Sequence, residues 1–397
     1  MEKLRSIEEA QALVLGRVRA LPAEAVPLEQ ALGRVLAADA RAVVDLPPFP
    51  SSAMDGFALR AADTPGTLPV VDRSAAGSPS PRPLGAGEAI GISTGGVVPD
   101  GADAVIPIEY VVEYDNRIEI GAAVEVGANV RPRGGDITAG EVVCPAGTRL
   151  APAQLGALAA AGVAGLSCGQ RPRAAVLATG TELRPPGTPL GPGEVYEANG
   201  LMLAAALAAA GAAVERFPAV GDDLDAHRAA IARGLDFDML VTSGGVSVGR
   251  HDLVRPVLAE LGAEEVFWRV AVKPGKPISF SVRGGTLVFG LPGNPVSALV
   301  GFELFVRPAV LALQGASEPL PRFEPGRLAR PARRSPGRDE LVPGRSAAAD
   351  DGVVLEPLGG QESHMIASAA TADVLVLIPR GDGELPAGAA VRYLRLG

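Results

Sequence analysis

The chain has 397 residues, which is too long for one small module and typical of two to three domains. Glycine (50) and proline (36) are frequent, yet 47% of the residues are hydrophobic, so we expect a globular protein with many tight turns rather than a disordered chain. The formal net charge of -9 argues against non-specific nucleic-acid binding, which needs a basic face. Of the 36 basic residues, only Lys3, Lys273 and Lys276 are lysines.

The sequence also argues against a structural zinc site, a secretion signal and a membrane span. Cys144 and Cys168 are the two cysteines, too few for a four-ligand zinc site at recognised spacing. The first residues are charged and amphipathic, without the apolar core of a secretion signal. The longest wholly apolar run, 201–214, has 14 residues, short of the roughly 18 that a membrane span needs. These features predict a cytoplasmic protein with no nucleic-acid and no membrane partner.

In chain order, helical periodicity comes first. Apolar residues recur at helical spacing over 6–21 and 28–42, which predicts two helices. The pattern then changes to short apolar runs between turns, such as 104–108 and 117–120, which predicts a β module. Helical spacing returns over 151–163, so we expect the β module to be an insertion in a helical platform.

The second half alternates strands and helices, which indicates a parallel sheet covered on both faces. Short apolar strands are predicted at 174–178, 237–241 and 287–290. Helices are predicted between and after them at 199–212, 223–234, 252–262 and 295–313. Apolar runs between turns in the tail, such as 374–378, predict a small β-barrel. The expected domains are a discontinuous helical platform (1–46 and 144–170), an inserted β module (47–143), an α/β domain (171–316) and a C-terminal β-barrel (317–397).

Each predicted parallel strand leads into a glycine-containing loop, at 179–182, 242–249 and 291–295. Ligands bind at the carboxyl ends of parallel strands, where glycine amides and helix N-termini can hold an oxyanion. One such loop alone is more often a tight turn, and Asn294 with Pro295 would also begin a helix in the ordinary way. Three loops in one sheet favour a phosphate or nucleotide cleft.

Carboxylates fall near the same sheet edge: Glu182, Asp222 or Asp223, and Asp252. An aspartate of the 222–223 pair and Asp252 could each cap a following helix. Clustered carboxylates also suit Mg²⁺ that bridges phosphates. Helix capping and metal binding both stay open for each residue, and the cluster as a whole favours an anionic ligand with a metal ion.

Two of the three lysines lie within four residues, in the loop 272–277. Lysine acts as a point charge that fits a crowded phosphate site, whereas the planar guanidinium of arginine needs a broad partner. The alternative is two solvated loop lysines. Nearly all other basic residues of the chain are arginine, so two lysines in one short loop indicate a local need for a compact positive charge. We therefore interpret Lys273 and Lys276 as anion ligands.

The β module holds three further dense segments, at 47–58, 93–103 and 131–136. The first combines prolines and serines with an Asp-Gly turn and could be only a proline-rich linker. The second is a hydroxyl- and glycine-rich loop that could be only a β-turn, and the third offers arginines to anions. Each segment alone indicates little.

Together these segments resemble the molybdopterin molybdenumtransferase family, which includes bacterial MoeA and the E-domain of animal gephyrin. The resemblance covers nearly the whole chain and keeps the family's order of motifs. The motifs are PSSAMDGFA (50–58), STGGVVPDGADAV (93–105), RPRGGDI (131–137), ATGTEL (178–183), TSGGVSVGRHD (242–252), VKPGKP (272–277) and GLPGNPVSA (290–298).

The resemblance implies a multidomain α/β plus β fold. This fold consists of the helical platform interrupted by the β module, a three-layer α/β domain similar to molybdopterin adenylyltransferases (MogA-like), and the C-terminal β-barrel.

The resemblance also implies a homodimer, with the active site between the α/β domain of one subunit and the β module of the other. The implied reaction inserts molybdate into adenylylated molybdopterin and releases AMP, with Mg²⁺ assisting. A molybdopterin adenylyltransferase and molybdoenzymes that accept the cofactor are possible partners.

The resemblance also implies roles for individual residues. Positions tied to activity are Asp55, Thr94, Glu182, Asp222 or Asp223, and Asp252, with Glu182 and Asp252 at the ligand or metal. Lys273 and Lys276 are expected at phosphate or molybdate. Further cofactor-binding positions are Gly244, Gly245, Ser247, Pro292, Asn294, Pro295, Arg133, Asp136, Arg338 and Ser368. Thr181 departs from the family, which often has aspartate there; if that aspartate helps to bind metal, the resemblance implies weaker metal affinity here.

Two other functions compete with this one. A molybdopterin adenylyltransferase would resemble the α/β domain alone, but such enzymes usually lack the platform and the barrel. A non-catalytic cofactor-binding scaffold of the gephyrin type joins the E-domain to an adenylyltransferase domain through a long linker, and this chain shows neither.

Overall fold

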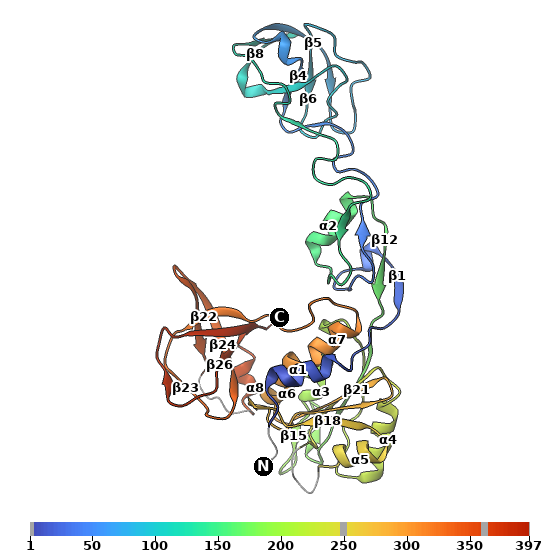
Figure 1. Ribbon diagram of the computed structural model, residues 1–397, viewed down its shortest axis with the longest axis vertical. Helices are drawn as coiled ribbons and strands as arrows, with labels where there is room; N and C mark the ends of the chain where they lie inside the picture. Colours follow the sequence, from blue (N-terminus) through green and yellow to red (C-terminus); the bar gives the residue numbers. More distant parts are fainter. Residues whose placement is uncertain (1–3, 247–251, 359–363, 397) are drawn as a thin grey trace.

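The computed structural model describes residues 4–246, 252–358 and 364–396. The chain is elongated, with the β module at one end and the α/β domain and the barrel at the other (Figure 1). Between them lies a narrow part that contains α2 (Pro152–Ala160), which confirms the helix expected over 151–163. An antiparallel ribbon of β1 (Ala23–Pro27) and β12 (Gly165–Gly169) runs from this part toward the α/β domain.

The first expected helix is present but shorter, as α1 (Ile7–Leu15). Its start is fixed by a capping box, in which the Glu9 amide donates to Ser6 Oγ at 3.1 Å and the Ser6 amide to the Glu9 carboxylate at 2.9 Å. The buried face of α1, which includes Ile7 and Val14, packs into the core of the α/β domain.

The helix expected over 28–42 is wrong. Only a 3₁₀ turn forms at its start, η1 (Leu28–Gln30), and its end is the short strand β2 (Ala40–Arg41). The amides of Gly33 and Leu36 donate to the carbonyls of Leu150 and Thr148 instead of to residues one helical turn earlier. Tertiary pairing with a distant segment therefore overrides the local pattern, while Leu36 is still buried in the platform core.

The β module is a six-stranded sheet of order β7-β4-β6-β5-β9-β8. Its strands are β7 (Ala104–Pro107), β4 (Gly56–Leu59), β6 (Ala89–Ile92), β5 (Gly66–Ser74), β9 (Arg117–Ile120) and β8 (Val111–Tyr114). The two strands expected at 104–108 and 117–120 are thereby confirmed.

The α/β domain has a six-stranded sheet of order β16-β13-β17-β21-β20-β18, whose first four strands are parallel. The strands are β16 (Ala213–Arg216), β13 (Arg173–Ala178), β17 (Met239–Ser243), β21 (Thr286–Leu291), β20 (Ser279–Arg283) and β18 (Glu264–Trp268). The three predicted parallel strands are confirmed, and all their residues except Arg173 are buried, as expected for a parallel sheet covered on both faces.

Helices cover both faces of this sheet and make three layers (Figure 1). α3 (Asn199–Ala209) packs on one face in a core with α1 and the helical stretch 295–313. α4 (Leu224–Gly234) and α5 (Val254–Glu260) pack on the other face.

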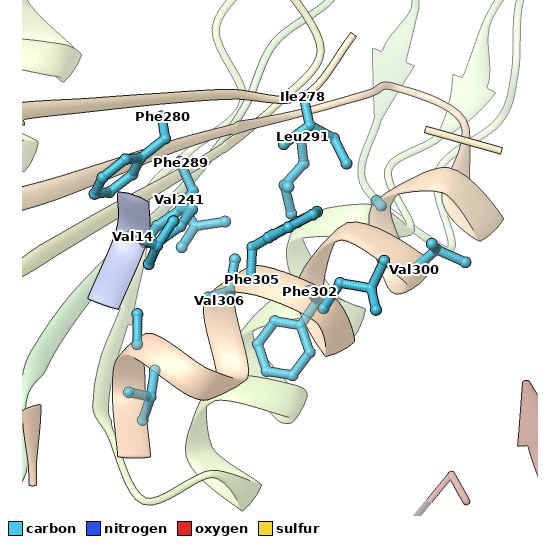
Figure 2. Packing of buried hydrophobic residues seen from close by; sticks show 14 of the residues in the cluster. Val14, Val241, Ile278, Phe280, Phe289, Leu291, Val300, Phe302, Phe305 and Val306 are labelled. Carbon is cyan, nitrogen blue, oxygen red and sulfur yellow. The ribbon is translucent and has the colours of Figure 1, made fainter. Parts of the chain in front are cut away.

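The stretch 295–313 is continuous and consists of α6 (Pro295–Gly301), a π-helical turn η4 (Phe302–Val306) and α7 (Arg307–Leu313). Within the described part of the chain, this is the one helix long and apolar enough to cross a membrane, but 78% of its apolar stretch is buried inside the protein. Figure 2 shows Phe302 and Phe305 packing in the same cluster as Phe280 of the sheet. The helix is thus a core element of the α/β domain.

Leu207→Ala is expected to lower the free energy of unfolding of the α/β domain by about 3 kcal/mol, because the Leu207 side chain is wholly buried between α3 and the sheet. Leu201, on the same helix, is 56% exposed, and Leu201→Ala is expected to change that free energy by less than about 0.5 kcal/mol. Urea unfolding followed by fluorescence of Trp268, the single tryptophan, measures both variants. An equal decrease in the free energy of unfolding in both variants would contradict the burial of Leu207 in this core.

The C-terminal region forms the expected barrel. Its strands are β24 (Asp339–Ala349), β25 (Gly352–Pro357), β22 (Glu324–Leu328), β28 (Ala390–Arg395) and β26 (Val374–Ile378), and pairing of β24 with β26 closes the ring. A strand from the α/β domain, β19 (Val272–Lys273), pairs with β24 at Asp339 and Glu340. The lysine loop is therefore attached to the barrel.

Candidate functional site

The three predicted glycine loops begin side by side. In the sheet register, Ala178 lies opposite Ser243, and Ser243 lies opposite Leu291, so the three strands end at one level. A pocket of about 840 Å³ opens there and is lined by residues of all three loops, including Gly180, Gly244 and Asn294. The structure thus confirms that the loops share one cleft.

Glycine is required in the second loop. Gly244 and Gly245 have φ values of 92° and 68°, in the left-handed region that favours glycine. A Cβ on Gly244 would lie 2.6 Å from the Thr179 carbonyl oxygen, and one on Gly245 would lie 2.7 Å from a Val254 methyl carbon. The second loop therefore packs directly against the first, and no side chain at these positions fills the pocket.

Three of the predicted carboxylates line this pocket: Glu182, Asp222 and Asp252. Asp223 instead caps α4, where its carboxylate accepts a hydrogen bond of 2.7 Å from the Ala226 amide. The pair 222–223 thus divides into one helix cap and one residue of the pocket wall. Ser247, expected in the same cleft, lies outside the described residues.

The carboxylates of the larger pocket fit a magnesium ion that is held mainly by the phosphate groups of a bound substrate. Among the described residues, no group of three or more histidine, cysteine or acidic side chains is close enough to hold a metal by itself. Mg²⁺ is usually bound by one or two carboxylates together with phosphate oxygens and water. The pocket carboxylates suit that mode better than a complete protein cage.

Asn199 joins two of the loops and was not identified from the sequence. Its side-chain amide donates to Ser243 Oγ at 2.8 Å and to the Gly293 carbonyl at 2.7 Å, and Ser243 Oγ donates to the Pro292 carbonyl at 3.2 Å. Asn199 is 8% exposed, and its Oδ1 has no hydrogen-bond partner among the residues that the structure describes. At the start of a helical pattern, asparagine is easily interpreted as a cap, which hides this role.

Asn199→Ala is expected to lower the kcat/KM of the reaction proposed below by about tenfold. Loss of the amide leaves the Gly293 carbonyl unpaired and frees the loop at Pro292, and such losses typically cost about 1–3 kcal/mol. Asn116→Ala, at an exposed position of the β module, is the matched control. Wild-type kinetics in the Asn199 variant would show that these hydrogen bonds do not position the loop.

A second pocket of about 650 Å³ adjoins the first and shares Pro277, Pro292, Asn294 and His364 with it. Its cationic lining residues are Lys273, Lys276 and Arg338. Asn294 stands at the N-cap of α6, with Pro295 as the first helical residue, as the ordinary interpretation of this pair expects. The predicted cations and the third glycine loop therefore form one continuous surface with the nucleotide-sized pocket.

The three cations differ in their surroundings. The Lys273 ammonium lies 2.9 Å from the carboxylate of Glu340, whose side chain is 4% exposed. Lys276 and Arg338 have no ion-pair partner within the ranges that the structure describes. Ser368 lies in α8 (Ile366–Ala369), whose first residue lines the larger pocket. Glu340 was not singled out in the sequence.

The β module, to which the remaining predicted residues belong, lies at the opposite end of the elongated molecule from the α/β domain (Figure 1). Asp55 and Thr94 are exposed neighbours, since the Thr94 amide donates to the Asp55 carboxylate at 2.7 Å. Arg133 pairs with Asp45 at 2.5 Å, and the Ala139 amide and Arg133 together lower the pKa of the Asp45 carboxyl. Asp136 is exposed nearby. Within one chain, the structure does not bring these residues to the pocket.

The fold is that of a multidomain α/β plus β protein with two adjoining pockets at one edge of its α/β sheet, and cationic residues line the smaller one. Three family models match consecutive parts of the chain. They are the MoeA N-terminal region, domains I and II (residues 5–162), a probable molybdopterin binding domain (175–312) and the MoeA C-terminal region, domain IV (325–396). The chain belongs to the MoeA family.

Named relatives are similar to this chain over nearly its full length. Molybdopterin molybdenumtransferase 2 of Mycobacterium tuberculosis is 38% identical, with 97% of this chain and 98% of the relative covered. The molybdopterin molybdenumtransferase of Staphylococcus aureus is 32% identical, over 97% and 94% of the two chains. A crystal structure of a molybdopterin biosynthesis MoeA protein from Pyrococcus horikoshii is 33% identical, covers 99% of both chains and has a TM-score of 0.77.

Proposed function

We propose that this protein is a molybdopterin molybdenumtransferase. It inserts molybdate into adenylylated molybdopterin and releases AMP, and so acts as a transferase in molybdenum cofactor biosynthesis. The observation that carries this function is the pair of adjoining pockets, because a pyrophosphate and a molybdate dianion would lie side by side across the shared residues Pro292 and Asn294.

The chemistry needs cations and backbone donors more than a protein nucleophile. The glycine loops and Asn199 line the larger pocket, which would hold the adenylylated group, while Lys276 and Arg338 line the smaller pocket and would attract the molybdate anion. Burial raises the pKa of the Cys144 and Cys168 thiols, which disfavours a thiolate at either position. The dithiolene sulfurs that bind molybdenum come from the substrate.

Magnesium is part of the proposal. When bound, Mg²⁺ would neutralise charge on the pyrophosphate as AMP leaves. Glu182 and Asp252 would hold it together with phosphate oxygens, and Asp222 lines the same pocket.

A homodimer is also part of the proposal. Asp55 and Thr94 are exposed and remote from the pocket of their own chain, so the β module of a partner subunit would complete the site. We place the reaction in the cytoplasm, where highly charged, water-soluble substrates are available. A molybdopterin adenylyltransferase would supply the substrate, and molybdoenzymes would accept the product.

The alternatives are not favoured. An adenylyltransferase would need only the α/β domain, whereas this chain also matches the N-terminal and C-terminal MoeA regions. Incubation with molybdopterin and Mg-ATP separates the functions. We expect no adenylylated product; its robust formation without another enzyme would contradict the proposal. A non-catalytic scaffold would bind molybdopterin but would show no turnover when molybdate is added.

A further inference from the structure

The smaller pocket, of about 650 Å³, is lined by more positive charge than is available to a ligand. Lys273, Lys276 and Arg338 line it, but the Lys273 ammonium already pairs with Glu340 at 2.9 Å. Three cations and one carboxylate leave two net positive charges, which equal and oppose the two negative charges of molybdate.

Glu340 is held in place by both the barrel and the α/β domain. It is 3% exposed, lies on β24 and pairs in register with Lys273 of β19 on one side and with Ile378 of β26 on the other. Ser335 Oγ lies 3.5 Å from its second carboxylate oxygen. A carboxylate this buried needs a compensating charge, so the pair holds the Lys273 ammonium toward the barrel.

We propose that Glu340 is a positioning residue that neutralises Lys273 and thereby limits the affinity of the site for molybdate. This inference rests on the proposed function and extends it to a residue of the barrel. Lys276 and Arg338 then supply the attraction for the dianion, while Lys273 acts as a hydrogen-bond donor of fixed position. A weaker anion site releases unproductively bound molybdate faster.

The test is Glu340→Gln, which keeps the shape of the side chain and its acceptor oxygen but removes the charge. We expect the KM for molybdate to fall by about threefold or more, because one uncompensated unit charge is added near a dianion, while kcat changes by less than about twofold. High ionic strength should reduce the difference. An unchanged or increased KM for molybdate in a folded variant would overturn the proposal.

Asp339→Asn is the matched control, with the same change of charge one residue earlier on β24. The Asp339 carboxylate faces Arg380, whose amide it binds at 2.9 Å. Adjacent side chains on a strand point to opposite faces, so this variant is expected to leave the KM for molybdate within about 1.5-fold of wild type. An equal decrease in both variants would show a general effect of net charge and overturn the role of the pair.

A double variant, Lys273→Gln with Glu340→Gln, covers the case in which the single variant does not fold. It replaces the ion pair by two amides and leaves the net charge of the site unchanged, so the KM for molybdate should stay within about threefold of wild type. A KM for molybdate that rises by more than about threefold would mean that the Lys273 charge binds molybdate directly and that Glu340 does not neutralise it.

The wild-type chain separates failure of this inference from failure of the proposed function. If wild type inserts no molybdenum, the function fails, and calorimetric titration with molybdate alone still compares wild type with Glu340→Gln. Tighter molybdate binding by the variant supports the inference there as well, and equal binding overturns it.

Discussion

Lys276→Ala should lower kcat/KM for molybdate by about 100-fold or more while changing the affinity for AMP by less than about threefold. Lys276 lines the smaller pocket, is exposed, and has no ion-pair partner in the part of the chain that the structure describes. Its ammonium is thus available to a dianion, and a charged hydrogen bond together with its Coulomb attraction is typically worth about 3 kcal/mol. Initial rates at varied molybdate, with AMP binding in parallel, measure the effect.

Removal of a cation from the C-terminal barrel, away from the pockets, should have little effect. Arg327 lies on β22 and pairs with Asp351 at 2.6 Å, so Arg327→Ala is a suitable control for loss of one positive charge. Wild-type rates for Lys276→Ala at limiting molybdate would show that the smaller pocket is not the molybdate site.

A mixture of two inactive variants should regain about a quarter of wild-type activity. Asp55→Ala removes a carboxylate from the β module, and Asp252→Ala removes one from the pocket of the α/β domain. If each site combines the β module of one subunit with the α/β domain of the other, a mixed dimer contains one site with both lesions and one intact site. Random exchange makes about half of the dimers mixed, and each of these has one working site of two.

Each variant alone should be inactive and should keep the dimeric state by light scattering. Activity is measured after subunit exchange at increasing ratios of the two variants. If the mixture stays as inactive as its components although mixed dimers form, then Asp55 and Asp252 serve the same site of one chain, and the proposed arrangement is wrong.

The strands and the loops of the α/β domain were predictable because their signals are local. The three parallel strands are rich in apolar residues, and the glycines that follow them mark turns that favour glycine, as Gly244 shows. The scarcity of lysine was also informative, since Lys273 and Lys276 line the pocket beside the third loop.

The remaining features depend on contacts between distant parts of the chain. The helical spacing over 28–42 is overridden by hydrogen bonds to residues more than a hundred positions later. Asn199 acquires its role only because Gly293, 94 residues away, lies within hydrogen-bond distance. Glu340 matters because strand pairing brings it beside Lys273. No local pattern carries such information.

The most direct measurement combines the purified full chain with adenylylated molybdopterin, molybdate and Mg²⁺, and follows AMP and protein-bound or released molybdenum cofactor over time. We predict that AMP appears together with inserted molybdenum in about a one-to-one ratio, only when molybdate is present, and that the rate saturates with molybdate. AMP release that does not depend on molybdate, or no molybdenum insertion at all, would contradict the assignment as a molybdenumtransferase.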